Sequence, residues 1–94
     1  RSENNTFLLC HLIRILGDIG DSLQRRDSLD FTLGKIRRTL VGFLSDSSWA
    51  VRAFTVEALR RFPTEGILLK FKLLLNEEEH PLVRNRLKVA LGKE

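Results

Sequence analysis

The residues of this sequence that can act as nucleophiles or metal ligands are few, and their spacing fits no catalytic or metal site. Cys10 is the only cysteine, and His11 and His80 are the only histidines. Cys10 and His11 are adjacent, so a helix would point them to different faces and prevent a nucleophile–base or zinc pair. A small buried side chain is the alternative to a reactive thiol at Cys10. We therefore predict no catalytic, cofactor-binding or metal-binding residue, and no enzymatic activity.

Charged and aromatic residues are the other source of chemistry. The chain has a net charge of +4, and residues 31–76 carry eight basic and three acidic side chains. Such a basic segment can meet nucleic acid, anionic lipid or an acidic protein, although a solvated helix face explains it equally well. Trp49 is the only tryptophan. It is either an anchor at a protein interface, where tryptophan is enriched, or a ring that covers the turn before its helix.

The elements that must position these residues are helices, because apolar residues recur at helical spacing and never alternate as in a strand. We expect helices over about 6–17, 31–44 and 49–62, a fourth after the cap Thr64 and a fifth from Pro81. Asp30 is expected to cap the second helix. The residues of the third helix that are expected to face the core are Val51, Phe54, Thr55, Ala58, Leu59 and Phe62. The polar segment 18–30 is expected to be a long inter-helix connection, with or without a short extra helix.

Six glycines punctuate this pattern. Gly17 and Gly20 are expected to end the first helix. Gly34 and Gly42 fall inside the second helix, where glycine costs about 1 kcal/mol relative to alanine. A neighbouring helix that approaches closely would explain that cost.

The chain as a whole is expected to be one all-α domain, residues 1–94. No apolar segment approaches the roughly 18 to 20 residues that a membrane span needs, and the polar start 1–5 does not resemble a signal peptide. A single cysteine is compatible with a reducing compartment, so we predict an intracellular protein that does not bind membranes.

An internal repeat organises the second half of the chain. Residues 48–52 (SWAVR) align with 80–84 (HPLVR), and at the same offset of 32 positions Ala58-Leu59 aligns with Ala90-Leu91. Each copy is preceded by a helix and an acidic turn.

This pattern resembles the HEAT-repeat family of HEAT-like and armadillo-type α-solenoids, in which an acidic inner turn precedes a helix that opens with Val-Arg. The resemblance implies a short right-handed α-solenoid of about two and a half antiparallel helix pairs, a fragment of a longer one. It also implies a ladder of hydrogen bonds between successive turns. That role falls on four residues, namely Asp46, Arg52, Glu78 and Arg84. The first helix lacks the Val-Arg opening and departs from the pattern.

The same resemblance implies an interaction scaffold that binds a protein partner along the face of the second helices. The candidate partner-binding residues are Trp49, Arg60, Arg86 and Lys88. The alternative is binding of the nucleic-acid phosphate backbone by a basic concave surface, as in proteins similar to the DNA alkylation repair type. Self-association through uncapped solenoid ends is a further expectation.

Overall fold

The computed structural model describes residues 3–26 and 31–92, and every regular element in these two ranges is a helix. The fold is therefore all-α, as predicted. The elements are α1 (Glu3–Arg25), α2 (Phe31–Gly42), the short 3-10 helix η1 (Phe43–Ser45), α3 (Trp49–Leu59), α4 (Glu65–Glu77) and α5 (Pro81–Ala90). Within this part of the chain, no helix is both long and apolar enough to cross a membrane.

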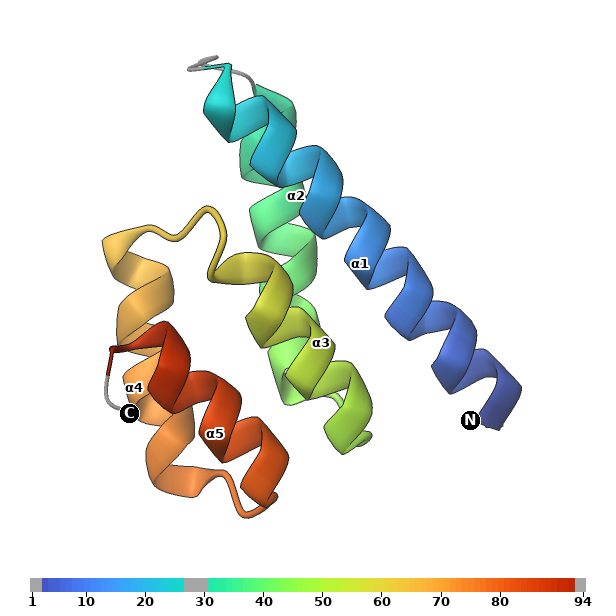
Figure 1. Cartoon of the computed structure of the whole chain (residues 1–94), viewed down its shortest axis with the longest axis vertical. Coiled ribbons are helices and arrows are strands. Elements are labelled where there is room, and N and C mark those ends of the chain that lie inside the picture. Colours follow the sequence, from blue (N-terminus) through green and yellow to red (C-terminus); the bar gives the residue numbers. More distant parts are fainter. Residues whose placement is uncertain (1–2, 27–30, 93–94) are drawn as a thin grey trace.

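The helices form two layers. Helix α3 packs between α1 and α5, and these three helices run in the same direction (Figure 1). Helices α2 and α4 run the opposite way behind them, with α2 against α1 and α3 and with α4 against α5. The molecule measures 36 × 32 × 18 Å, so it is a slab with two broad faces.

Local signals account for the starts of α4 and α5. The Thr64 hydroxyl accepts a hydrogen bond from the backbone N–H of Ile67 and caps α4, as predicted. Pro81 occupies the first turn of α5, and His80 caps that helix by accepting from the N–H of Leu82. The Asp30 cap that we predicted for α2 lies outside the described residues.

The core lies between the two layers. Its largest fully buried side chains include Phe62, Phe71, Ile13, Leu40 and Leu59. The one buried hydroxyl in the described ranges, that of Thr55, donates to the carbonyl of Val51 one turn earlier, so its burial leaves no donor unpaired.

The first helix corrects the sequence prediction. Helix α1 does not end at Gly17 but continues to Arg25, so the prediction of a connection over 18–30 is wrong for 18–25. Both glycines are packing positions. A β-carbon at Gly17 would lie 2.9 Å from that of Ala58, and one at Gly20 would overlap the ring of Phe62. Only glycine lets α1 approach α3 this closely.

The glycines of α2 correct a second prediction. A β-carbon added at Gly34 or Gly42 would meet no atom within 4 Å. The close helix approach expected at these positions therefore occurs at the glycines of α1 instead.

Candidate functional site

The two turns that align in sequence have the same local geometry. The carboxylate of Asp46 accepts a hydrogen bond from the backbone N–H of Ser48 at 2.9 Å. Thirty-two positions later, Glu78 accepts one from the N–H of His80 at 3.1 Å. Each acidic side chain therefore closes a turn onto the N-cap residue of the next helix, which fixes the entry of α3 and of α5.

The arginines one turn into these helices also match. Arg52 donates from Nη1 to the carbonyl of Asp46 at 2.8 Å. Arg84 donates from Nη1 to the carbonyl of Glu78 at 3.0 Å, and also to that of Leu75 at 2.7 Å. Both arginines reach back six residues to the acidic residue of their own turn, so the 32-residue repeat holds at the level of hydrogen bonds.

One ion pair joins the two turns. The guanidinium of Arg52 binds the carboxylate of Glu78 in a bidentate manner, with distances of 2.8 and 2.9 Å. Burial by itself would raise the pKa of Glu78, but the bonds from Arg52 and from the N–H of His80, with the charge of Arg52, hold that pKa below its ordinary value. A buried bidentate pair of this kind sets the register of two elements.

The four predicted ladder residues thus gather where the α2–α3 and α4–α5 turns meet. Arg52 and Glu78 make the contact between turns, while Arg84 donates to carbonyl oxygens. Asp46 stabilises its own turn. At this end of the molecule, the Arg52–Glu78 pair joins the two turns.

Trp49, the first residue of α3, stacks on the imidazole of His80. The ring centroids are 4.2 Å apart and the planes differ by 9°. Trp49 is nevertheless 42% exposed, so one side of the indole is covered while part of the ring still faces outward. Both expected roles, cover for a turn and exposed anchor, are compatible with this position.

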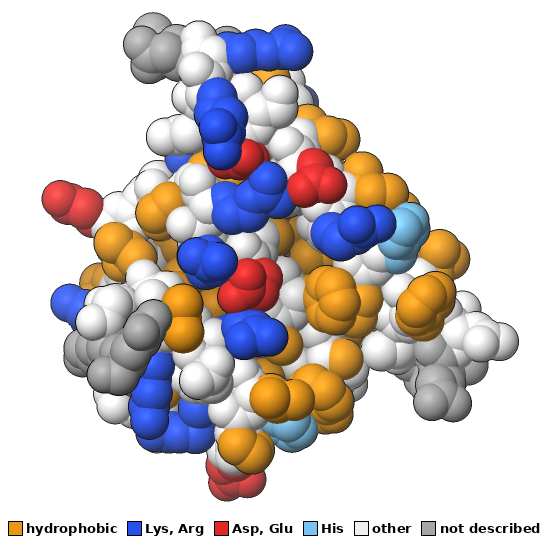
Figure 2. Space-filling view, viewed as in Figure 1, with side chains coloured by type: hydrophobic (Ala, Val, Ile, Leu, Met, Phe, Trp, Pro, Cys, Tyr) orange, Lys and Arg blue, Asp and Glu red, His pale blue; other side chains and the backbone are white. Residues whose placement is uncertain are grey.

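A hollow of about 430 Å³ opens beside Trp49 on the layer formed by α1, α3 and α5. We call it the groove. Its lining residues are Arg14, Trp49, Ala50, Ala53, Phe54, Glu57, Ala58, Arg61, Leu82 and Arg86. A second hollow of about 440 Å³ adjoins it and shares Arg14, Ala50 and Phe54. In Figure 2, hydrophobic side chains gather over α1 and the start of α3.

Phe54 is the main residue that sequence reasoning misplaced. Its spacing predicted an inward position, but it is 42% exposed and lines both hollows. Leu82 and Arg14 also line the groove and were missed. The sequence does hold a signal for this position. Ala50, Ala53 and Phe54 lie on one face of the helix, and the two alanines leave that face short of large apolar side chains.

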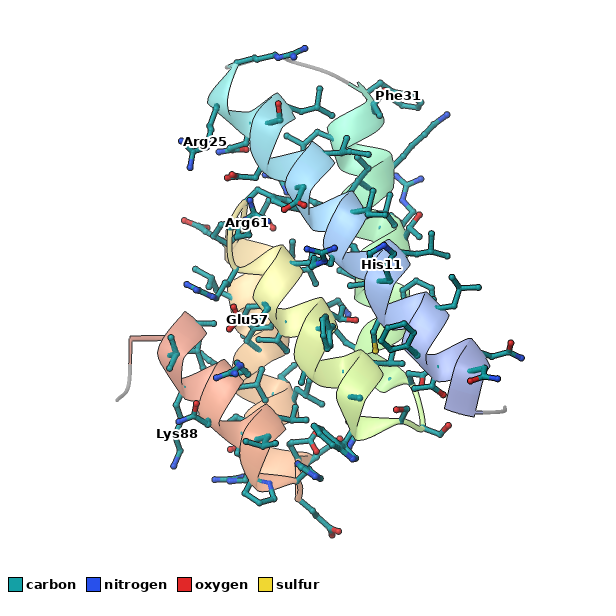
Figure 3. The ribbon with its side chains drawn as sticks, turned by 45° about the vertical axis from the view of Figure 1, so that its right-hand side comes forward. His11, Arg25, Phe31, Glu57, Arg61 and Lys88 are labelled. Carbon is teal, nitrogen blue, oxygen red and sulfur yellow. The ribbon has the colours of Figure 1, made fainter. Side chains whose placement is uncertain are left out.

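Two of the three basic residues predicted for partner binding, Arg60 and Arg86, meet at one carboxylate, and the third lies apart from them. Arg60 binds the carboxylate of Glu57 at 3.1 Å, and Arg86 lies 3.5 Å from the same carboxylate. Lys88 points away from α3 on the far side of α5 (Figure 3). Arg60 and Arg86 thus lie close together, bridged by Glu57, while Lys88 faces another side of α5.

Another charged cluster joins α1 to the end of α3. Arg61 binds Asp18 at 2.6 Å and Asp21 at 2.9 Å, and Arg25 also binds Asp21. Burial opposes the ionised form of Asp21, but hydrogen bonds from Arg61 and Arg25 leave its pKa lowered. Figure 2 shows acidic and basic side chains next to each other over this part of α1 and α3. Arg61 thus has a structural partner that the sequence alone did not reveal.

Comparisons of this chain with protein-family models, curated proteins and solved structures find no match. The described residues hold no group of three or more His, Cys, Asp or Glu side chains that could bind a metal ion. The groove and its charged rim form the candidate site.

Proposed function

We propose that this chain is a HEAT-type α-solenoid segment that acts as an interaction scaffold for a protein partner. Three observations support the solenoid part of the proposal. Helices α1, α3 and α5 form one layer with α2 and α4 behind it. The two acidic turns repeat their hydrogen bonds after 32 positions. The pair Arg52–Glu78 links one turn to the next, as a ladder would.

The groove carries the functional part of the proposal. Trp49, Phe54 and Leu82 are each between 42% and 49% exposed, and all three line one hollow. Apolar side chains gathered in a concave surface with a charged rim are typical of protein-binding sites. Small side chains at Ala50, Ala53 and Ala58 form its floor, which leaves room for an apolar side chain from a partner.

The rim indicates the charge of that partner. Arg14, Arg61 and Arg86 line the groove together with one acidic residue, Glu57. A partner segment that combines an aromatic or aliphatic anchor with acidic residues would place the anchor against the alanines of the floor and its carboxylates beside the arginines of the rim.

Selection from a display library of random 16-residue helical peptides, a length of about four turns, tests this proposal. We expect enriched peptides to combine large apolar with acidic residues. The variant Ala53→Arg, which fills the floor, should abolish their binding. The matched control Leu73→Arg changes an exposed position of α4 and should leave binding intact. Enriched peptides that bind Ala53→Arg normally would refute the groove as the site, and so would a selection that enriches none.

Nucleic-acid binding is the second candidate, because Arg60 and Arg86 share the single carboxylate of Glu57 and leave one positive charge unbalanced. Binding to a random DNA duplex should then weaken steeply with salt, by roughly 0.9 units of log–log slope for each phosphate contacted. The double variant Arg60→Glu, Arg86→Glu should remove that binding. No binding at low salt excludes this candidate and leaves the protein-partner proposal in place.

A further inference from the structure

Helix α1 has an apolar stripe on the side that faces away from the rest of the molecule. Its members are Leu8, Leu12, Ile15 and Ile19, which are 56, 47, 38 and 45% exposed. Their spacing of four, three and four residues places them along one line of the helix. The opposite side of α1 packs on the core through Cys10, Ile13, Gly17 and Gly20.

The stripe differs from the isolated exposed leucines that any protein surface has. Four β-branched or leucine side chains follow each other over three turns, and α1 is long enough, at 23 residues, to present them on a straight rod about 34 Å long. Figure 1 places α1 at the edge of its layer, with α3 on one side only. The stripe therefore lies open along the free edge of the molecule.

We propose that this stripe binds the same stripe of a second copy of the chain, with the two α1 helices antiparallel about a twofold axis between Leu12 and Ile15. In that register Leu8 faces Ile19 of the second copy, and Leu12 faces Ile15 of the second copy. Each contact between the two α1 helices then pairs one leucine with one isoleucine, and the same two pairs recur on the other side of the axis. Such self-complementarity is what a twofold interface requires.

The residues beside the stripe support this register. His11 and Asp18 lie on the same flank, and both are exposed. The antiparallel register brings His11 of one copy opposite Asp18 of the other, twice in the dimer, where the imidazole N–H can donate to the carboxylate. Arg61 contacts Oδ1 of Asp18, and the Asp18 side chain remains 58% exposed.

The residues on the other side of the stripe favour the same antiparallel register. Leu9 and Leu16 are half-buried against the core, and the same register places Leu9 beside Leu16 of the second copy. A parallel pair would instead put His11 against Leu16 and Asp18 against Leu23, which leaves polar groups facing apolar ones. Hydrogen bonding and hydrophobicity both favour the antiparallel pair.

Sedimentation equilibrium of the full chain tests the association. The interface between the two stripes is short, so its area lies at the low end of interface sizes. We therefore expect a weak dimer, whose formation is detectable at chain concentrations from about 10 μM to about 1 mM. The double variant Leu12→Glu, Ile15→Glu should be monomeric at every concentration and keep its helical circular dichroism. The control Leu69→Glu, Leu73→Glu changes an exposed leucine pair of α4 and should dimerise like the parent chain. A parent chain that stays monomeric at about 1 mM overturns the proposal, as does a dimer that only the α4 variant disrupts.

Cysteine cross-linking tests the orientation. An equal mixture of Leu12→Cys and Ile15→Cys chains, distinguished by a mass tag, is oxidised in air. The antiparallel register predicts disulfides between the two different variants, because Leu12 and Ile15 face each other. Disulfides within each variant alone would indicate a parallel pair and refute the register. The parent chain, whose Cys10 is buried, is the control and should not cross-link.

This inference does not depend on the protein-binding groove. The variant Ala53→Arg fills the groove on α3 and should leave the dimer unchanged, while Leu12→Glu, Ile15→Glu should leave peptide binding unchanged. The failure of one proposal is therefore distinguishable from the failure of the other.

Discussion

Gly17 of α1 faces Ala58 of α3 so closely that a β-carbon on the glycine would lie 2.9 Å from that of the alanine. One helical turn further on, Gly20 meets the fully buried ring of Phe62 in the same way. The two glycines leave one strip of the α1 surface without side chains, and α3 packs against that strip. These two contacts set how closely α1 approaches α3.

Replacing Gly20 with alanine is therefore expected to destabilise the fold. Phe62 is fully buried and cannot move aside freely, so overpacking should lower the free energy of unfolding by about 1 to 3 kcal/mol. Gly34→Ala is the matched control, because it adds a methyl group inside α2 with no atom within 4 Å. That variant should gain stability, by about 0.5 to 1 kcal/mol. Urea unfolding measures both, and equal effects of the two substitutions would contradict the packing role of Gly20.

The ion pair between the turns gives a second prediction. Glu78→Gln keeps the shape of the side chain but removes the charge that Arg52 binds, at a site where the Glu78 side chain is 3% exposed. We expect a loss of about 2 to 3 kcal/mol in the free energy of unfolding. Glu57→Gln breaks the pair with Arg60, in which both side chains are at least 40% exposed, and should cost at most about 1 kcal/mol. Chemical denaturation of both variants decides whether burial makes this difference.

The lowered pKa of Glu78 predicts how stability depends on pH. Because the folded pKa lies below the ordinary value of 4.5, the unfolded chain binds a proton that the folded chain does not. The contribution of Glu78 is complete above that ordinary value and is lost as the pH falls through the folded pKa. Urea unfolding of the parent chain and of Glu78→Gln between about pH 7 and about pH 3 should show the two stabilities converging in acid. A difference that stays constant over this range would contradict the assignment.

The stacking of Trp49 on His80 can be separated from the capping role of the histidine. His80→Ala removes both, so it should shift the emission of the only tryptophan to the red and cost about 1 kcal/mol. His80→Asn keeps a side chain that can cap α5 but removes the aromatic partner. It should shift the fluorescence equally and retain most of the stability. An unshifted spectrum in both variants would show that the indole does not rest on His80 in solution.

Local sequence signals predicted much of the helical architecture. Thr64 and Pro81 have the side-chain chemistry of helix starts, and the structure uses them in that way. Val51 and Val83, which align in the sequence repeat, are also equivalent in the structure in that both side chains are fully buried. These predictions succeed because capping, proline geometry and apolar periodicity act over a few residues, within the reach of a local pattern.

The glycines and Phe54 could not be placed in this way. A glycine that ends a helix and a glycine that admits a neighbouring helix look alike in sequence, and only the presence of Ala58 and Phe62 opposite Gly17 and Gly20 decides between them. Phe54 has the spacing of a core residue but stays 42% exposed, because no described helix covers that side of α3.

The sequence by itself determined the all-α class, the starts of α4 and α5 and the repeated acidic turns with their arginines, since each depends on interactions between near neighbours. Only the tertiary structure decided that α1 continues through its glycines and that Arg52 reaches Glu78 rather than a nearer acid. It also decided that Trp49, Phe54 and Leu82 line one groove. Those outcomes depend on which helix faces lie opposite each other, and residues many positions apart settle that through packing.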